Sequence, residues 1–175
     1  MKTNFTSIRL EEPNDHALVR VVNEQSFNRV GEADLVDKLR AGCANILSLV
    51  AICDHQIVGH CLFSPVTIRN DHGEIQGMGL GPVAVLPCNQ RQGIGSQLIK
   101  AGLGILRERD CPFVVVLGHP DYYSRFDFTP ASWYGISCQW PGIPDNVFMA
   151  LILDSKRMEE VSGVARYRDE FNEVT

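Results

Sequence analysis

The first part of the chain alternates between short apolar runs and amphipathic stretches. Three apolar runs are bounded by polar or turn-forming residues, as strands are; they are Ile8–Leu10, Leu47–Cys53 and Ile57–Phe63. The polar pair Asp54–His55 separates the last two runs, which are therefore predicted to form a hairpin. The pattern lets the third strand continue through Val66–Arg69 to the strong turn signal Asn70–Gly73.

Two helices are predicted between the first and second strands. Pro13 suits the first turn of a helix, and Ala17, Val21 and Val22 then form its apolar face. A second helix is predicted over Glu32–Arg40, where apolar residues recur at helical spacing; these are Ala33, Leu35, Val36 and Leu39.

The second half of the chain continues the alternation of strands and helices. A strand is predicted over Gly79–Pro87 and a helix over Gln97–Arg109, with Ile99, Leu103 and Leu106 on one face of that helix. Phe113–Leu117 is a continuous β-branched apolar run and is predicted to be a buried strand, and Val147–Leu153 is another. This order predicts an α/β fold with a mixed sheet.

The length of 175 residues suits one domain. We predict that this domain covers residues 1–155, with the turn-rich stretch Pro141–Asp145 as a loop between strands. The remaining residues, 156–175, are polar. They are predicted to be either a tail with a short edge strand around Val164–Tyr167 or a partly disordered segment.

Composition and charge exclude several classes of partner. No apolar run approaches the roughly 20 residues of a membrane-spanning helix, and the first residues lack the apolar core of a signal peptide. We therefore expect a cytoplasmic protein with no membrane partner. The formal net charge is −5, and basic residues such as Lys156–Arg157 are interleaved with acids, so we expect no nucleic-acid partner.

The six cysteines give no metal signal. No C-x-x-C occurs and no Cys/His cluster has zinc spacing, so we expect no metal. Most of the cysteines lie in apolar contexts, as reduced core thiols do. Cys88, beside the glycine-rich turn, could serve as a nucleophile, but no base is placed near it in the sequence to activate it.

A glycine-rich turn is the most informative feature of the chain. The run Gln90–Ser96 follows the apolar strand and opens the helix, and it contains Gly93 and Gly95. The free N–H groups of a first helical turn bind anionic oxygens, so the run predicts a phosphate site. The spacing matches neither the G-x-x-x-x-G-K-[ST] P-loop nor the G-x-G-x-x-G dinucleotide motif. A plain helix start with two turn glycines is the alternative.

The strand before this turn is interrupted. Gly79–Pro82 places glycines and a proline inside a strand pattern, which indicates a bulge or the close approach of another backbone. Val83 and Val85 lie two residues apart, so their backbone groups point to the same edge. An ordinary buried strand with an edge proline is the alternative, and it leaves the interruption unexplained.

A third informative segment, after the glycine-rich turn and the interrupted strand, follows the predicted strand Phe113–Leu117. There the chain reads His119–Phe128, with the strings V-V-V-L-G-H-P and Y-Y-x-R-F-x-F. Together with V-A-V-L-P and Q-R-Q-G-I-G-S, these strings resemble the GCN5-related N-acetyltransferase (GNAT) family, over residues 8–153. Within that family the chain looks like the YhbS-type acetyltransferases of bacteria.

The resemblance implies a single-domain GNAT-like fold. Its sheet is mixed but mostly antiparallel, with a splayed central strand and helices on both faces. It also implies acetyl-CoA as acyl donor. The pantetheine arm would pair with the splayed strand, and the pyrophosphate would bind the glycine-rich turn. The implied donor-binding residues are Val83, Ala84, Val85, Gln90, Arg91, Gln92, Gly93, Ile94, Gly95 and Ser96.

The family pattern Y-x-x-x-G-F implies a general acid. Tyr123 and Phe128 match it, so Tyr123 would protonate the departing CoA thiolate. Asp127 stands where the family usually has glycine, although aspartate tolerates the left-handed conformation better than most residues. Tyr122 is interpreted as an aromatic packing residue.

The general base is not evident from the sequence. Family members often carry a glutamate on the splayed strand, but this chain has Gly79–Gly81 there. Glu32, at the start of the second helix, is a candidate, or else an acidic residue that only favours the helix dipole. Other candidates are His60, His119 and Glu74, although a histidine on an apolar strand is more often a hydrogen-bonded core residue.

The leading interpretation is therefore an acetyl-CoA-dependent N-acetyltransferase. It would act on a primary amine, of a small molecule or of an exposed protein side chain, by direct attack. The alternative is a non-catalytic acyl-CoA-binding or regulatory module. The missing strand carboxylate and Asp127 in place of the usual glycine favour it, and Tyr123 disfavours it. Because dimers are common in the family, a homodimer is a candidate assembly.

Overall fold

The computed structural model describes residues 6–71 and 73–173. The predicted turn residue His72 and both chain ends lie outside these ranges, so the outer limits of the predicted domain (residue 1) and tail (residue 175) do too. The described chain divides into two compact units. The first comprises residues 6–63, 82–104 and 169–173, and the second comprises residues 64–71, 73–81 and 105–168.

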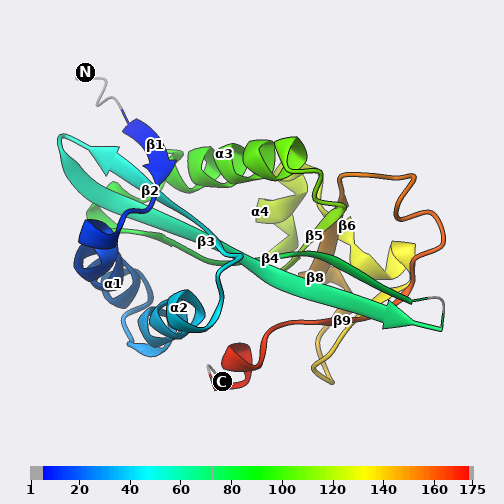
Figure 1. Cartoon of the computed structure of the whole chain (residues 1–175). Helices are drawn as coiled ribbons and strands as arrows, with labels where there is room; N and C mark the ends of the chain where they lie inside the picture. Colours follow the sequence, from blue (N-terminus) through cyan, green and yellow to red (C-terminus); the bar gives the residue numbers. More distant parts are fainter. Residues whose placement is uncertain (1–5, 72, 174–175) are drawn as a thin grey trace. The chain divides into compact units, whose positions relative to one another are not determined.

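The first unit contains an antiparallel set of strands (Figure 1). They are β1 (Thr6–Leu10), β2 (Leu47–Cys53), the first half of β3 (Gln56–Asn70) and the end of β4 (Gly73–Val85). Asp54 and His55 have φ of 49° and 65°, as a tight two-residue hairpin turn requires. The hairpin and the continuation of its second strand are therefore confirmed.

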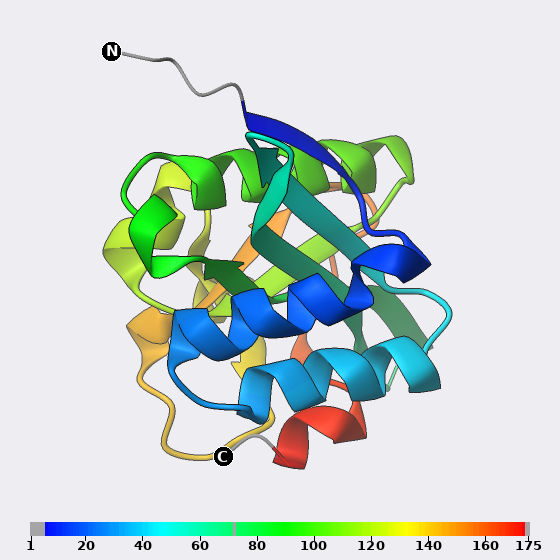
Figure 2. The same ribbon diagram turned by 90° about the vertical axis from the view of Figure 1, so that its left-hand side faces the viewer.

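Helices α1 (His16–Phe27) and α2 (Gly31–Gly42) lie side by side on one face of these strands, as Figure 2 shows. Pro13 opens a short 3₁₀ turn, Pro13–Asp15, before α1. The predicted apolar face of α1 was right for Val22 but wrong for Ala17 and Val21, which are exposed; the buried residues are Val19, Val22 and Asn23. The pattern of apolar residues does not reveal this face, because the buried Asn23 is polar and binds His60 inside the core.

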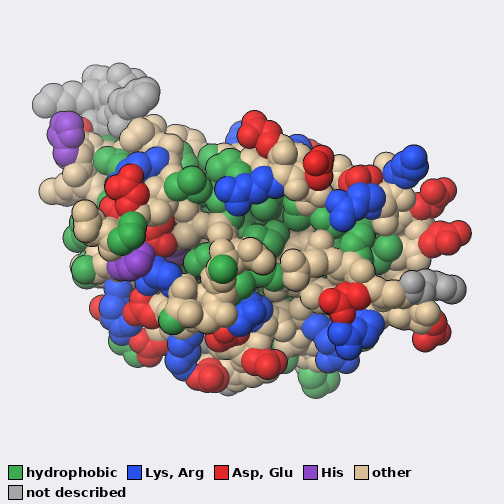
Figure 3. Space-filling view, in the orientation of Figure 1, with side chains coloured by type: hydrophobic (Ala, Val, Ile, Leu, Met, Phe, Trp, Pro, Cys, Tyr) green, Lys and Arg blue, Asp and Glu red, His purple; other side chains and the backbone are tan. Residues whose placement is uncertain are grey.

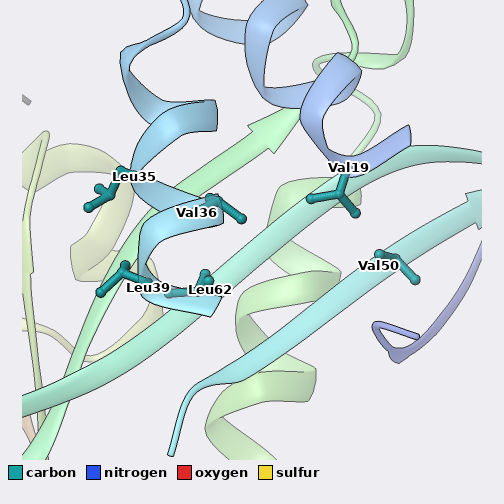
Figure 4. Packing of buried hydrophobic residues seen from close by; sticks show 6 residues of the cluster. All are labelled: Val19, Leu35, Val36, Leu39, Val50 and Leu62. Atoms are coloured by element: carbon teal, nitrogen blue, oxygen red, sulfur yellow. The ribbon is translucent and has the colours of Figure 1, made fainter. Parts of the chain in front are cut away.

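The core of the first unit has two layers because successive strand residues point to opposite faces. Val50 and Leu62 pack against Val19 of α1 and against α2, as Figure 4 shows. Phe171, in the short helix η6 (Asp169–Glu173), packs on the same cluster. On the other face, Phe63 meets helix α3 (Ile94–Glu108) at Gly102. Helices thus cover both faces of the strands in this unit, as predicted.

Gly102 and Gly104 lie in the same helix but have different surroundings. A Cβ at Gly102 would lie 2.2 Å from Phe63 Cε2, whereas no atom lies within 4 Å of one at Gly104. We expect Gly102→Ala to lower the free energy of unfolding by about 1–3 kcal/mol through overpacking. Gly104→Ala should raise it by about 0.5–1 kcal/mol, because alanine is the better helix former. Urea denaturation measures both, and effects of the same sign would contradict this packing argument.

The second unit contains the remaining strands. Strand β5 (Phe113–Leu117) pairs in parallel with Met78–Leu80 of β4 and antiparallel with β8 (Phe148–Ile152). Strand β8 pairs antiparallel with the short β6 (Thr129–Pro130). Antiparallel pairs outnumber parallel ones across the described strands, so the predicted α/β fold with a mixed, mostly antiparallel sheet is confirmed.

The segment after residue 155 forms a strand, β9 (Gly163–Arg166). It is not the predicted edge strand, because it pairs antiparallel with Thr67–Arg69 of β3 and parallel with β7 (Ile136–Cys138). Strands β6 and β7 were not predicted, since two or three residues are too few to show a period. The division between residues 155 and 156 stays a prediction.

Candidate active site

The glycine-rich turn connects β4 to α3 inside the first unit. A 3₁₀ turn, Pro87–Asn89, is followed by exposed residues 90–93, in which Arg91 and Gly93 have φ of 60° and 82°. The carbonyl of Gly93 accepts the Gln97 N–H at 3.0 Å, so α3 begins at Ile94, three residues earlier than predicted. Gly95 and Ser96 therefore lie in the first helical turn, where backbone N–H groups point toward the start of the helix.

The two glutamines of the turn stabilise its own backbone. Gln90 Nε2 donates to the carbonyl of Val85 at 3.0 Å, and Gln92 Nε2 donates to the carbonyl of Cys88 at 3.2 Å. Ile94 is buried and lies beside Gly59 of β3, which fixes the start of the helix. Because these contacts hold the turn in place, its backbone N–H groups and the exposed Arg91 remain as the groups suited to an anion.

The end of β4 is held by a residue that sequence reasoning missed. Ser26, in the last turn of α1, accepts the Val85 N–H at 2.8 Å and donates its hydroxyl to the Val85 carbonyl at 2.5 Å. The two residues are 59 positions apart, and a serine near a helix end gives no sequence signal for such a contact. Val83 and Val85 are half-buried, and Ala84 is fully buried.

Tyr123 belongs to the second unit, at the end of the short helix α4 (Pro120–Tyr123). Its ring makes edge contacts with Tyr122 and Phe128, at centroid distances of 5.1 and 5.9 Å. It also lies over Gly118, where an added Cβ would come within 2.2 Å of the Tyr123 ring. Asp127 has φ of 66°, so aspartate does adopt the left-handed turn where the family usually has glycine.

At Gly79, one of the β4 positions considered for the missing carboxylate, the structure leaves no room for a side chain. A Cβ at Gly79 would lie 2.6 Å from Tyr167 Cε1 and 2.8 Å from Val66 Cγ2, so a side chain at this position has no room. Burial raises the pKa of the Tyr167 phenol, and the neighbouring Cys138 and Tyr123 raise it further. Tyr167 therefore stays protonated at neutral pH and is unsuited to be the general base.

Glu32 is held by an ion pair. It lies in the first turn of α2, is only 7% exposed, and receives the guanidinium of Arg29 across both of its carboxylate oxygens. Two further candidates are exposed instead: Glu74 pairs with Arg69 at 2.5 Å, and His119 precedes α4. Glu32 lies in the first unit, whereas Tyr123 lies in the second.

His60 is a buried core residue, which confirms the interpretation as a hydrogen-bonded core histidine. Its Nδ1 lies 3.0 Å from Asn23 Nδ2, and its Nε2 lies 2.9 Å from Ser48 Oγ. Since Asn23 Nδ2 is a donor, Nδ1 accepts and Nε2 carries the proton, which leaves no lone pair to take a proton from Ser48. Burial and Arg40 lower the pKa of His60 to about 3. The cluster ties α1 to β2 and β3.

Charged side chains along α1 and α2 mostly pair with each other. Arg20 binds Asp34 and Asp37 at 2.7 and 2.6 Å, and Arg40 binds Glu11 at 2.5 Å. In Figure 3, acidic and basic side chains alternate over the lower left of the face shown, without a basic patch there. The absence of a nucleic-acid partner stays a prediction from the sequence.

Cys88 is exposed, with Sγ 3.1 Å from Asn89 Oδ1. Within residues 6–71 and 73–173, no three or more His, Cys, Asp or Glu side chains are grouped so as to hold a metal ion. In the same ranges, no helix combines the length and the apolar character needed to cross a membrane.

The comparison with known families decides the assignment. A family model described as an acetyltransferase (GNAT) domain matches residues 7–131, which is more than half of the chain. The chain belongs to the GNAT family. YhbS of Escherichia coli (strain K12), an uncharacterised N-acetyltransferase, is 36% identical over 166 residues, which cover 94% of this chain and 98% of YhbS. The family resemblance drawn from the motifs is thereby confirmed.

Solved GNAT structures extend this likeness to the fold. A crystal structure of Escherichia coli YhbS in complex with CoA superposes with a TM-score of 0.89 at 34% identity, covering 98% of this chain and 94% of that one. A GNAT acetyltransferase from Brucella melitensis in complex with acetyl-CoA gives a TM-score of 0.77 at 36% identity, covering 96% and 99%. The predicted GNAT fold is confirmed.

Proposed function

We propose that this GNAT protein transfers the acetyl group of acetyl-CoA to a primary amine. The observation that carries the proposal is the turn between β4 and α3, with left-handed residues at Arg91 and Gly93 leading into the start of a 15-residue helix. Such a turn suits a pyrophosphate. The CoA and acetyl-CoA complexes of two relatives support the same donor.

The proposed donor site follows the end of β4 and the turn. The pantetheine arm pairs with the edge of Val83–Val85, and the pyrophosphate lies against the backbone of residues 90–96. Arg91 contributes an exposed positive charge to that end. The Val83 N–H is the proposed donor to the thioester oxygen, which becomes negatively charged in the transition state.

The proposed chemistry is a direct transfer. The neutral amine nitrogen attacks the thioester carbonyl carbon, a C–N bond forms, and the C–S bond breaks. The amine gives one proton to a general base, and the leaving CoA thiolate takes one from the hydroxyl of Tyr123, which is the proposed general acid. A phenol is protonated at neutral pH and can donate. Glu32 stays a candidate base, and its pairing with Arg29 would have to open for that role.

We propose a small-molecule amine or an exposed protein amine as acceptor, because family membership fixes the donor chemistry better than the acceptor. The homodimer and the cytoplasmic location stay predictions from the sequence.

Thermal unfolding with ligands tests the donor assignment. CoA or acetyl-CoA at 100 times its Kd should stabilise the protein by about 2.7 kcal/mol, which raises Tm by roughly 5–10 °C for a chain of this size. ATP and NAD serve as controls and should give no comparable rise. No shift with millimolar acetyl-CoA would overturn the proposed function.

Release of free thiol from acetyl-CoA in the presence of an amine panel then tests catalysis. Amine-dependent release supports the transferase. A CoA-dependent shift of Tm without thiol release from any amine would instead favour the non-catalytic acyl-CoA-binding module.

A further inference from the structure

The hydroxyl of Ser26 occupies both hydrogen-bonding groups of the Val85 backbone. It accepts from the N–H at 2.8 Å and donates to the carbonyl at 2.5 Å, and that carbonyl also accepts from Gln90 Nε2 at 3.0 Å. A hydroxyl offers one donor and two acceptor sites, so a single serine can satisfy the two groups at once. An amide of an incoming ligand would need the same two groups.

The orientation of β4 places Ser26 on the strand edge that is proposed to bind the acyl donor. The N–H of Leu86 donates to the carbonyl of Val58 in β3 at 2.9 Å. Because backbone groups of successive strand residues point to opposite edges, Val85 and Val83 face away from β3. This is the edge along which the pantetheine amides would pair. Ser26 therefore stands where part of the acyl donor would bind.

The helix that carries Ser26 is firmly anchored. Asn23 lies one turn earlier on α1 and binds His60, which in turn contacts Ser48, and all three side chains are buried. Displacement of the whole helix would break this buried cluster. Rotation of the Ser26 side chain alone would release the backbone groups of Val85. Ser26 is only partly buried, so its hydroxyl has room to turn away from Val85 and take another partner.

We propose that Ser26 sets the affinity for the acyl donor by competing with pantetheine for the backbone of Val85. In the empty enzyme the Ser26 hydroxyl makes hydrogen bonds to the Val85 N–H and carbonyl. When the acyl donor binds, an amide of pantetheine replaces the hydroxyl. The proposal rests on the proposed function, because it assigns Val85 to the donor site. Its consequence is unusual: removal of a hydrogen-bonding side chain beside the site should strengthen binding.

The test is calorimetric titration of CoA into wild-type protein and into Ser26→Ala and Ser26→Cys variants. In the empty enzyme both variants leave the Val85 N–H without a strong partner and the Val85 carbonyl with Gln90 Nε2 alone, so the Kd for CoA should fall by about 5- to 10-fold. Ser26→Thr keeps the hydroxyl and should bind like the wild type. Gln25→Ala, at the exposed neighbouring position of the same helix, is the matched control and should also leave Kd unchanged.

Thermal midpoints supply the second readout. Without ligand, Ser26→Ala should unfold at a lower temperature than the wild type; with saturating CoA the two midpoints should converge, because the hydroxyl is displaced in both complexes. An unchanged or raised Kd, or a midpoint difference that persists with CoA, overturns the competition. Failure of the wild type to bind CoA overturns the proposed function instead, so the two failures are distinguishable.

Discussion

Tyr123→Phe should lower kcat by about 100-fold or more while the Kd for CoA stays within about twofold of the wild-type value. The change removes one hydroxyl and keeps the ring, whose edge contacts with Tyr122 and Phe128 hold α4 in place. General acid catalysis contributes roughly 10²–10⁴-fold, and the leaving thiolate needs its proton only in the transition state. Steady-state kinetics of thiol release, with CoA titration beside them, measure both quantities.

Tyr122→Phe is the matched control for this prediction. Tyr122 is the preceding residue on the same helix, and its ring contacts Tyr123, Phe126 and the guanidinium of Arg125. Loss of its hydroxyl should leave kcat near the wild-type value, since it was interpreted as a packing residue. Equal losses in the two variants would indicate a general disturbance of α4, and an unchanged kcat in Tyr123→Phe would exclude Tyr123 as the acid.

The elements that the sequence predicted well are those whose signal is local. Strands β2 and β5 have the predicted bounds, because a mostly apolar and mostly buried run ends where polar or turn residues begin. The turn before α3 was predicted for the same reason: glycine and the helix start are adjacent in the chain. The left-handed conformation of Asp127 agrees with the tolerance of aspartate for it, although the turn at this position was implied by the family pattern.

The features that the sequence could not show depend on partners far along the chain. Asn23 belongs to the buried face of α1 because His60 binds it, and no helical pattern of apolar residues reveals a polar member. Gly79 lacks a side chain because Tyr167 lies against it. Ser26 reaches Val85 only after the chain has folded. In each case the structural role of the residue depends on a tertiary contact and not on its neighbours in the sequence.

A substitution in the turn before α3 is expected to have the second large effect, a loss of affinity for CoA. Gly93→Val should raise the Kd for CoA by about 10- to 100-fold and leave kcat at saturating donor largely intact. Gly93 has φ of 82°, and no atom lies within 4 Å of a Cβ built there, so backbone strain rather than a clash opposes the substitution. A β-branched residue at positive φ costs about 1–3 kcal/mol, which the turn can relieve by moving away from its anion-binding geometry.

Gly142→Val separates this local effect from general destabilisation. Gly142 has φ of 77°, again with no atom within 4 Å of an added Cβ, and it lies in the loop between β7 and β8 of the second unit. The strain of the two substitutions is therefore matched, and both should lower Tm, but only Gly93→Val should weaken CoA binding. If CoA affinity survives Gly93→Val, or falls equally in both variants, the left-handed turn at Gly93 is a helix start and no pyrophosphate site.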